Sequence, residues 1–176
     1  MRRKLAAVAS AIALGIGLAV TVTAGPAAAA WTGPCYEEEL NLKVYDLPNK
    51  TDLQVVVLPC VKREGNKLYA SLRVDWTPMN WPWFGSAHKI DSFKIVAHLE
   101  RRANGSSSDR VIAKHTCDIT SAINDANGGV VTCKTPVYTA YDPAYNYSGD
   151  GYIRADIDND GESWSDWNFH GSPLLY

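Results

Sequence analysis

The chain has 176 residues, with 17 basic and 19 acidic side chains and a formal net charge of −2 at pH 7. This weakly acidic balance disfavours nucleic acid and anionic membrane surfaces as partners, because both require basic patches on the protein. A chain of this length holds one domain with a core of its own rather than two.

The first 30 residues have the pattern of a secretory signal peptide. Three basic residues near the start precede an apolar run from Leu5 to Ala24, and small residues follow up to Ala30. This order predicts export and cleavage before Trp31. An uncleaved membrane anchor is the alternative, because the apolar run is long. We expect residues 31–176 to form a single extracellular domain that has no contact with the membrane after cleavage.

Four cysteines lie in this expected domain, namely Cys35, Cys60, Cys117 and Cys133. An even number of cysteines in an exported chain predicts two disulfides. Of the three pairings that four cysteines allow, we expect Cys35 with Cys60 and Cys117 with Cys133. Each of these pairs brackets one connection between strands, and neighbouring strands pair most often. A zinc site is disfavoured, because the sequence has no C-x-x-C and export favours oxidation.

The first part of the domain alternates between turns and short strands. An irregular arm over 31–39 is expected to be tied down by the first disulfide, and a short strand is expected at Asn41–Tyr45. Leu53–Val61 is a second strand, which Pro59 places at a sheet edge or a bulge near its end. The clearest strand is Leu68–Trp76, whose alternating residues predict one face in the core and one face in water.

The segment Thr77–Ser86 contains two prolines and a glycine, so it is predicted to be a loop, yet it carries Trp81, Trp83 and Phe84. One interpretation is that these rings fold back as a lid over one end of the domain. The other interpretation is that they form an exposed apolar recognition surface.

A long hairpin is predicted from Ile90–Arg102 and Arg110–Asp118, which are joined by a flexible turn of Asn-Gly and serines. One helical turn is expected within Ile119–Asn127, where Asp or Thr side chains can cap its start. A strand at Val130–Lys134 follows. The second disulfide would clamp this connection.

A tyrosine-rich loop is predicted over Pro136–Gly151, and its rings include Tyr141, Tyr145 and Tyr147. Tyrosine offers a large contact area at little cost in rotamer entropy and has a polar tip, so such a loop suits recognition. Half-buried packing of the rings explains the same residues equally well.

The chain ends with a predicted hairpin over Tyr152–Phe169. Asp156, Asp158 and Asp160, followed by Gly161, have the D-x-D-x-D-G spacing that opens a calcium loop. The glutamate that closes such a loop at its twelfth position is missing, and alternating residues that end in Asp-Gly are a hairpin signal. We therefore expect a plain acidic hairpin that does not bind calcium tightly.

Seven or eight short strands, with a turn about every ten residues and almost no helical period, predict an all-β fold. The expected architecture is an antiparallel β-sandwich with two disulfides, immunoglobulin-like in the broad sense. A closed barrel is the alternative.

The sequence contains no G-x-S-x-G and no H-E-x-x-H motif, and its cysteines are committed to disulfides. His98 and His115 would suit a metal if they were neighbours across their hairpin, although packing explains them better. The carboxylates of the last hairpin lie about 7 Å apart on one strand face, with no evident cleft for a glycosidase. We predict that the protein is not an enzyme and has no cofactor and no metal.

The expected function is that of a secreted binding module, which engages a protein partner through its two aromatic loops. The expected binding residues are Trp81, Trp83, Phe84, Tyr141, Tyr145 and Tyr147. A carbohydrate-binding domain is the first alternative, with Trp164 and Trp167 as a stacking platform beside Arg154 and Asp166. A secreted protease inhibitor is the second, and it ranks lowest because neither aromatic loop adjoins a cysteine.

An alanine-rich leader, a small disulfide-bonded β domain and the lack of catalytic motifs occur together in this chain. In size, leader and class it resembles the small exported β-sandwich proteins of actinobacteria. One class of these is the adaptor subunit of umbrella-shaped secreted toxin particles, which joins a lectin-bearing subunit to a polymorphic-toxin core. The resemblance extends over the whole chain but carries no residue-by-residue motif. It implies a role in assembling an extracellular antibacterial complex.

Overall fold

The structure is a computed structural model. It describes residues 30–36, 41–48, 51–79, 90–125, 127–158 and 160–176. Residues 1–29 of the predicted signal peptide lie outside the described residues, so its cleavage stays a prediction. Within the described ranges, no helix is both long and apolar enough to cross a membrane.

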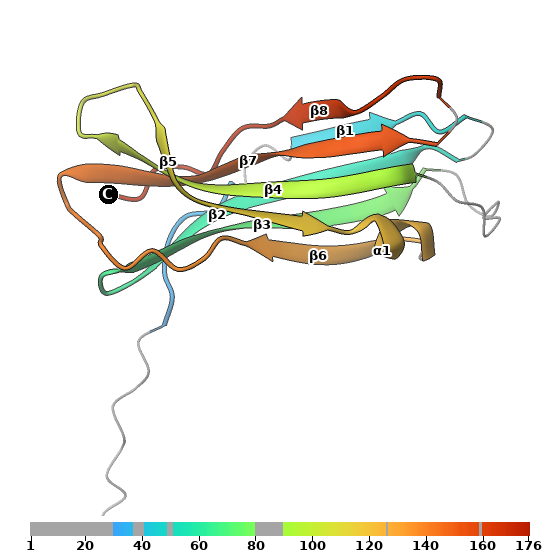
Figure 1. Cartoon of the computed structure of the whole chain (residues 1–176). Helices are drawn as coiled ribbons and strands as arrows, with labels where there is room; N and C mark the ends of the chain where they lie inside the picture. Colours follow the sequence, from blue (N-terminus) through green and yellow to red (C-terminus); the bar gives the residue numbers. More distant parts are fainter. Residues whose placement is uncertain (1–29, 37–40, 49–50, 80–89, 126, 159) are drawn as a thin grey trace, which may run out of the picture.

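Almost all regular structure is β-strand, arranged in two antiparallel four-stranded sheets (Figure 1). The first sheet has the strand order β1-β2-β3-β6 and the second the order β5-β4-β7-β8. These two sheets confirm the predicted antiparallel β-sandwich. In chain order the elements are β1 (Asn41–Tyr45), β2 (Leu53–Glu64), β3 (Lys67–Pro78), β4 (Ile90–Ala103), β5 (Arg110–Asp118), α1 (Thr120–Asp125), β6 (Gly129–Lys134), β7 (Tyr145–Ile157) and β8 (Ser165–Asn168).

The core lies between the sheets and follows the alternation of the strands. On β3 the predicted inward residues are at most 5% exposed, whereas Arg73 on the other face is exposed. On β4 the predicted inward residues from Phe93 to Leu99 are fully buried. Alternation places every second side chain on the same face of a strand, so the apolar residues of both strands meet in one layer. This part of the fold confirms the sequence prediction.

Pro59 lies beyond the part of β2 that pairs with β1, because this pairing ends at Val57. Beyond that point the arm lies against β2, and the Tyr36 N–H donates to the Pro59 carbonyl oxygen at 2.9 Å. The N and O atoms of one strand residue point to the same edge, so the N–H that Pro59 lacks would face the arm and not β3. The predicted sheet edge or bulge is therefore not found: β2 is an inner strand that pairs with β3 through Pro59 without a shift of register. The arm takes the place of β1 on the other side, and the Cys35–Cys60 disulfide fastens it there.

The Cys117–Cys133 disulfide joins β5 to β6, the edge strands of the two sheets, with a Cα–Cα distance of 5.8 Å. The chain between them passes through the short helix α1, whose Ile123 is buried in the core. Both predicted pairings are therefore confirmed. This bridge fixes the sheets to one another along one side of the sandwich.

The prediction of a loop up to Gly151 is wrong for its second half. β7 begins at Tyr145 and pairs with β4 along its length, with Tyr145 opposite Ala103. Glycines weakened the strand pattern, but the packing requires them. A Cβ on Gly149 would collide with the carbonyl oxygen of Cys60 in the opposite sheet. The two sheets therefore approach one another backbone to backbone at this point.

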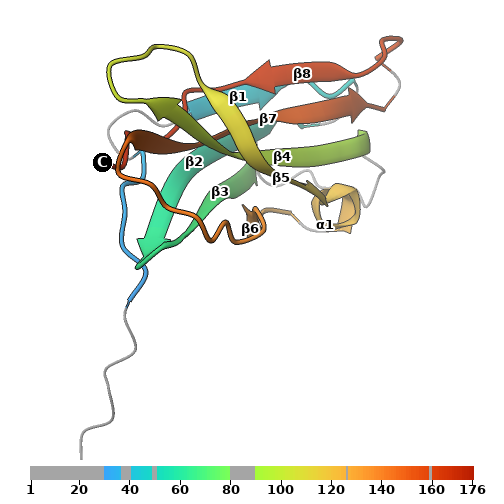
Figure 2. The same cartoon turned by 60° about the vertical axis from the view of Figure 1, so that its left-hand side comes forward.

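The C-terminal tail returns alongside the start of β7, as Figures 1 and 2 both show. Tyr147 and Leu175 exchange two backbone hydrogen bonds, of 2.9 and 2.8 Å. The tail thus continues the pairing along the edge of β7 beyond the end of β8. It also brings residues 170–174 close to the outer face of the second sheet.

Candidate functional site

The two segments that carry the predicted aromatic anchors join the described chain at opposite ends of β4. Trp81, Trp83 and Phe84 lie outside the described residues, so both interpretations of their loop stay open. The described chain leaves this loop at Ile90, the first residue of β4, whereas the tyrosine loop meets the last residues of β4. A 14-residue strand spans about 43 Å, which separates the two attachment points.

The tyrosine loop is held firmly against the β2–β3 turn. Tyr138 and Leu68 exchange two backbone hydrogen bonds of 2.7 Å. The Tyr141 N–H donates to the carbonyl oxygen of Asn66 at 3.1 Å. An irregular segment is therefore fixed by bonds to residues far away in the sequence, and its side chains have defined positions.

Tyr147 does not lie at the surface, contrary to its expected place among the binding residues. Its side chain is fully buried, because β7 is a strand here and Tyr147 faces inward. Its hydroxyl accepts a hydrogen bond from the Asp142 N–H at 2.9 Å and donates one to the Asp142 carbonyl oxygen at 3.3 Å. Burial raises the pKa of Tyr147. The ring therefore supports the loop from below, and a partner has no access to it.

Tyr141 and Tyr145 are half-buried, and each carries an arginine over its ring. The guanidinium carbon of Arg63 lies 3.4 Å from the Tyr141 ring centroid, and that of Arg101 lies 4.5 Å from the Tyr145 ring centroid. Arg101 also donates to the Tyr138 hydroxyl at 3.4 Å. We call these five residues, Arg63, Arg101, Tyr138, Tyr141 and Tyr145, the tyrosine–arginine cluster. Cation–π contacts of this kind hold the guanidinium flat against the ring.

The residues proposed as a flat stacking platform for sugars do not share one surface. Trp167 is half-buried and packs against the core and Phe169, whereas Trp164 is 43% exposed beneath the Lys94 ammonium. Arg154 and Asp166 bind one another through two hydrogen bonds of 2.7 Å. This mutual pairing raises the pKa of Arg154 and lowers that of Asp166.

The β7–β8 hairpin confirms the predicted turn after the acidic run. Gly161 has a φ of 76°, which a tight turn requires, and Asp160 accepts a hydrogen bond from the Glu162 N–H at 2.8 Å. Asp166, which could have added a fourth carboxylate to a calcium site, is engaged by Arg154. Weak calcium binding stays a prediction.

His98 and His115 are not neighbours across their hairpin. His98 pairs with Lys114, and His115 with Ala97, so the two histidines occupy different positions of the ladder and opposite faces. His115 does lie close to the sulfur atoms of Cys117 and Cys133, but these sulfurs are bonded to one another. The hypothetical histidine pair is therefore not assembled.

A polar groove that the sequence did not reveal lies on the outer face of the second sheet, with a volume of about 410 Å³. Alternate residues of β4 and β7 form its floor, and the β4–β5 turn and the C-terminal tail form its walls. We define this polar groove by Glu100, Arg102, Asp109, Ser148, Asp150, Tyr36 and residues 170–174.

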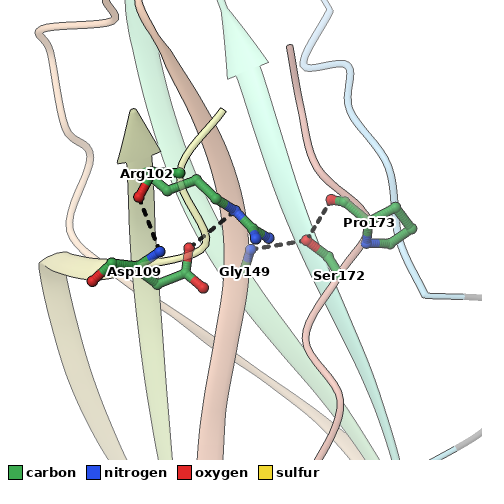
Figure 3. A network of polar contacts seen from close by, with 7 residues as sticks. Arg102, Asp109, Gly149, Ser172 and Pro173 are labelled. Carbon is green, nitrogen blue, oxygen red and sulfur yellow. Dashed lines mark hydrogen bonds and ion pairs between the residues drawn. The ribbon is translucent and has the colours of Figure 1, made fainter. Parts of the chain in front are cut away.

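The walls of the polar groove are anchored by hydrogen bonds and an ion pair (Figure 3). Arg102 Nε lies 3.2 Å from a carboxylate oxygen of Asp109. The Gly149 N–H donates to the Ser172 hydroxyl oxygen at 2.8 Å, the Ser172 N–H donates to the Gly149 carbonyl oxygen at 2.7 Å, and the Ser172 hydroxyl donates to Pro173 at 3.0 Å. The tail is therefore a fixed wall.

The floor of the groove holds negative charge that its surroundings do not balance. Burial raises the pKa of Glu100 to about 7, and the charges of Asp150 and Asp109 add to the rise, while Arg102 opposes it. Burial raises the pKa of Asp150 as well. His98 Nδ1 lies 3.8 Å from Glu100, but burial and the charge of Lys114 lower the pKa of His98 and so disfavour a compensating positive charge there.

A clear local signal for the groove does not exist in the sequence. Glu100 and Asp150 alternate with core residues, and this pattern predicts only a face in water. The register that places Glu100 opposite Ser148 and next to Asp150 depends on pairing between strands about fifty residues apart. Comparison of the chain with protein-family models, with curated protein sequences and with solved structures finds no match.

Proposed function

We propose that this chain is a secreted, non-enzymatic binding module that engages a protein partner through the tyrosine–arginine cluster. The observation that carries the proposal is the cluster itself: three half-buried tyrosines and two stacked arginines at one end of the sandwich. Tyrosine and arginine are among the residues that contribute most binding energy at protein interfaces.

The cluster is organised before a partner arrives. Tyr138 and Tyr141 are fixed by backbone hydrogen bonds to the first sheet, and Tyr147 supports the Tyr141 ring, with a centroid distance of 5.5 Å. Ordering loops and side chains opposes association, so a surface that is already ordered loses less free energy when it binds. Stacking uses the face of each guanidinium, while Arg63 Nε donates to the Gly65 carbonyl oxygen at 2.8 Å and Arg101 donates to the Tyr138 hydroxyl at 3.4 Å. The other N–H groups of each guanidinium suit carboxylates of the partner.

Two disulfides are consistent with an extracellular protein. Together with the predicted leader they support secretion as part of the proposal. The attachment of the tryptophan loop and the tyrosine loop at opposite ends also suits an adaptor that joins two proteins. Assembly of an extracellular antibacterial complex, which the resemblance to toxin-particle adaptors implies, remains the most specific form of this proposal.

The test is the affinity of the secreted chain for a partner isolated from the culture supernatant. Arg63→Ala and Tyr141→Ala should each weaken binding by about 2 kcal/mol, roughly thirtyfold, if they are hot spots. Arg73→Ala is the matched control, because Arg73 is exposed on the outer face of the first sheet and pairs only locally with Asp75. Equal affinity of all three folded variants would exclude the cluster as the contact surface.

A further inference from the structure

We infer that the polar groove is a second ligand site, which binds a polyhydroxylated molecule of the size of a mono- or disaccharide. The volume of about 410 Å³ lies within the range of small-molecule sites. The inference goes beyond the proposed function, because the groove and the tyrosine–arginine cluster share no residue. Its failure would leave the protein-binding proposal untouched.

The floor of the groove places acceptors side by side on neighbouring strands. Glu100 of β4 lies opposite Ser148 of β7, and Asp150 is the next outward residue along β7. Side chains at such positions have Cβ atoms about 5 Å apart across the pair and somewhat more along the diagonal. Side chains at these positions point to the same face of the sheet, so they can converge on the hydroxyl groups of one ligand.

The chemistry of the groove favours a ligand that both donates and accepts hydrogen bonds. Ionised Glu100 and Asp150 only accept, the Arg102 guanidinium only donates, and the Ser148 hydroxyl does both. An ammonium ligand would leave the donors unmatched, and an anion would be repelled by three carboxylates. Vicinal hydroxyl groups match both kinds of partner.

The margin of the groove offers a surface for the apolar face of a sugar ring. Tyr36 is half-buried there and stacks against His170, with 6.3 Å between the ring centroids. His170 is held in place through its backbone, which exchanges hydrogen bonds of 2.9 Å with the side-chain amide of Asn41. Because both walls are fixed, a ligand meets a formed site.

Binding of a polyhydroxylated ligand in the polar groove should depend on pH. The charged and titratable groups around Glu100 are Arg102 and His98 on β4, Asp150 on β7, Asp109 before β5, Lys114 on β5 and His170 in the tail. A ligand hydroxyl that donates to Glu100 favours its ionised form and lowers its pKa from about 7. Binding should therefore release protons, and the affinity should fall about tenfold from pH 8 to pH 6.

The experiment is a titration of the oxidised, secreted protein followed by two-dimensional ¹H–¹⁵N NMR. The probes are D-glucose, N-acetylglucosamine, cellobiose and trehalose, with spermidine and inorganic phosphate as a cation and an anion for comparison. We expect one of the sugars to shift the amide signals of Gly149, Gly151 and Gly171 in a saturable manner and more strongly at pH 8. Glu100→Gln and Asp150→Asn should each weaken binding about tenfold or more.

Glu162→Gln is the matched control, because Glu162 is exposed in the β7–β8 turn and lies outside the groove, and it should bind like the wild type. The dependence on pH is measured on the wild-type protein and needs no variant. The inference is overturned if no sugar gives saturable shifts at tens of millimolar, if spermidine or phosphate saturates the groove instead, or if folded Glu100→Gln binds as tightly as the wild type.

Discussion

Glu100→Gln should stabilise the protein at pH 8 and change its stability little at pH 4. Burial and like charges raise the pKa of Glu100 from its ordinary 4.5 to about 7 in the folded protein. The folded state therefore holds this proton more tightly than the unfolded state does. Between pH 4.5 and pH 7 the folded protein loses stability as the pH rises, and above pH 7 the loss is complete.

The two pKa values set the magnitude of this effect. Each pH unit between them corresponds to about 1.4 kcal/mol, which gives an upper limit of roughly 3 to 4 kcal/mol. Water screens the charge of Glu100, because 13% of this side chain is exposed and the groove is large enough to admit water. We therefore expect a loss of about 1 to 2 kcal/mol in the wild type, which glutamine removes.

Urea unfolding of both proteins at pH 4, 6 and 8 measures this difference, and thermal melting should show a shift of about 2 to 8 °C at pH 8. Asp150 lies beside Glu100 and ionises more easily once Glu100 is neutral, so the measured difference includes its response. Glu162→Gln, in the exposed turn, should follow the wild type at every pH. Parallel pH profiles of the wild type and Glu100→Gln would refute the reasoning that the groove holds unbalanced negative charge.

Three further predictions concern other parts of the molecule. Replacing Cys117 and Cys133 together by serine should lower the free energy of unfolding by about 3 kcal/mol in urea titrations, because the disulfide closes a loop of 16 residues between the sheets; an unchanged midpoint would show that the sheets hold together without it. Millimolar calcium should raise the stability of the EDTA-treated protein by less than about 1.4 kcal/mol; a larger rise that disappears in an Asp158→Asn, Asp160→Asn variant would revive the calcium site. Trp81→Ala with Trp83→Ala should leave far-ultraviolet circular dichroism and cooperative unfolding largely intact but weaken partner binding by about 2 kcal/mol or more per hot spot; an unfolded double variant would place these rings in the core.

The sequence alone was sufficient to predict those parts of the fold that are determined by residues close together in the chain. The alternation from Leu68 to Trp76 predicted both the strand and its buried face, and the turn at Gly161 predicted the last hairpin. The cysteine pairing followed from proximity along the chain, because each bridge closes a short connection. Local periodicity and turn residues act over a few positions, and these features do not depend on distant residues.

The features that were missed depend on pairing between distant segments. Residues 145–151 resemble a loop in composition, and they form a strand because β4 offers a partner along its full length. The same pairing turns Tyr147 inward and sets Glu100 beside Asp150. Arg63 and Arg101 reach the tyrosines from other strands, so no spacing in the sequence pointed to them.

The bare backbone contact at Gly149 has a consequence for how the molecule moves. Side-chain cores absorb small changes by shifting rotamers, but two backbones in contact have nothing to rearrange. The end of the sandwich that carries the tyrosine–arginine cluster should therefore be rigid, with little motion of one sheet relative to the other. Its amide protons around positions 147 to 151 should exchange with solvent only when the whole domain opens, so that the surface proposed for partner binding keeps one shape.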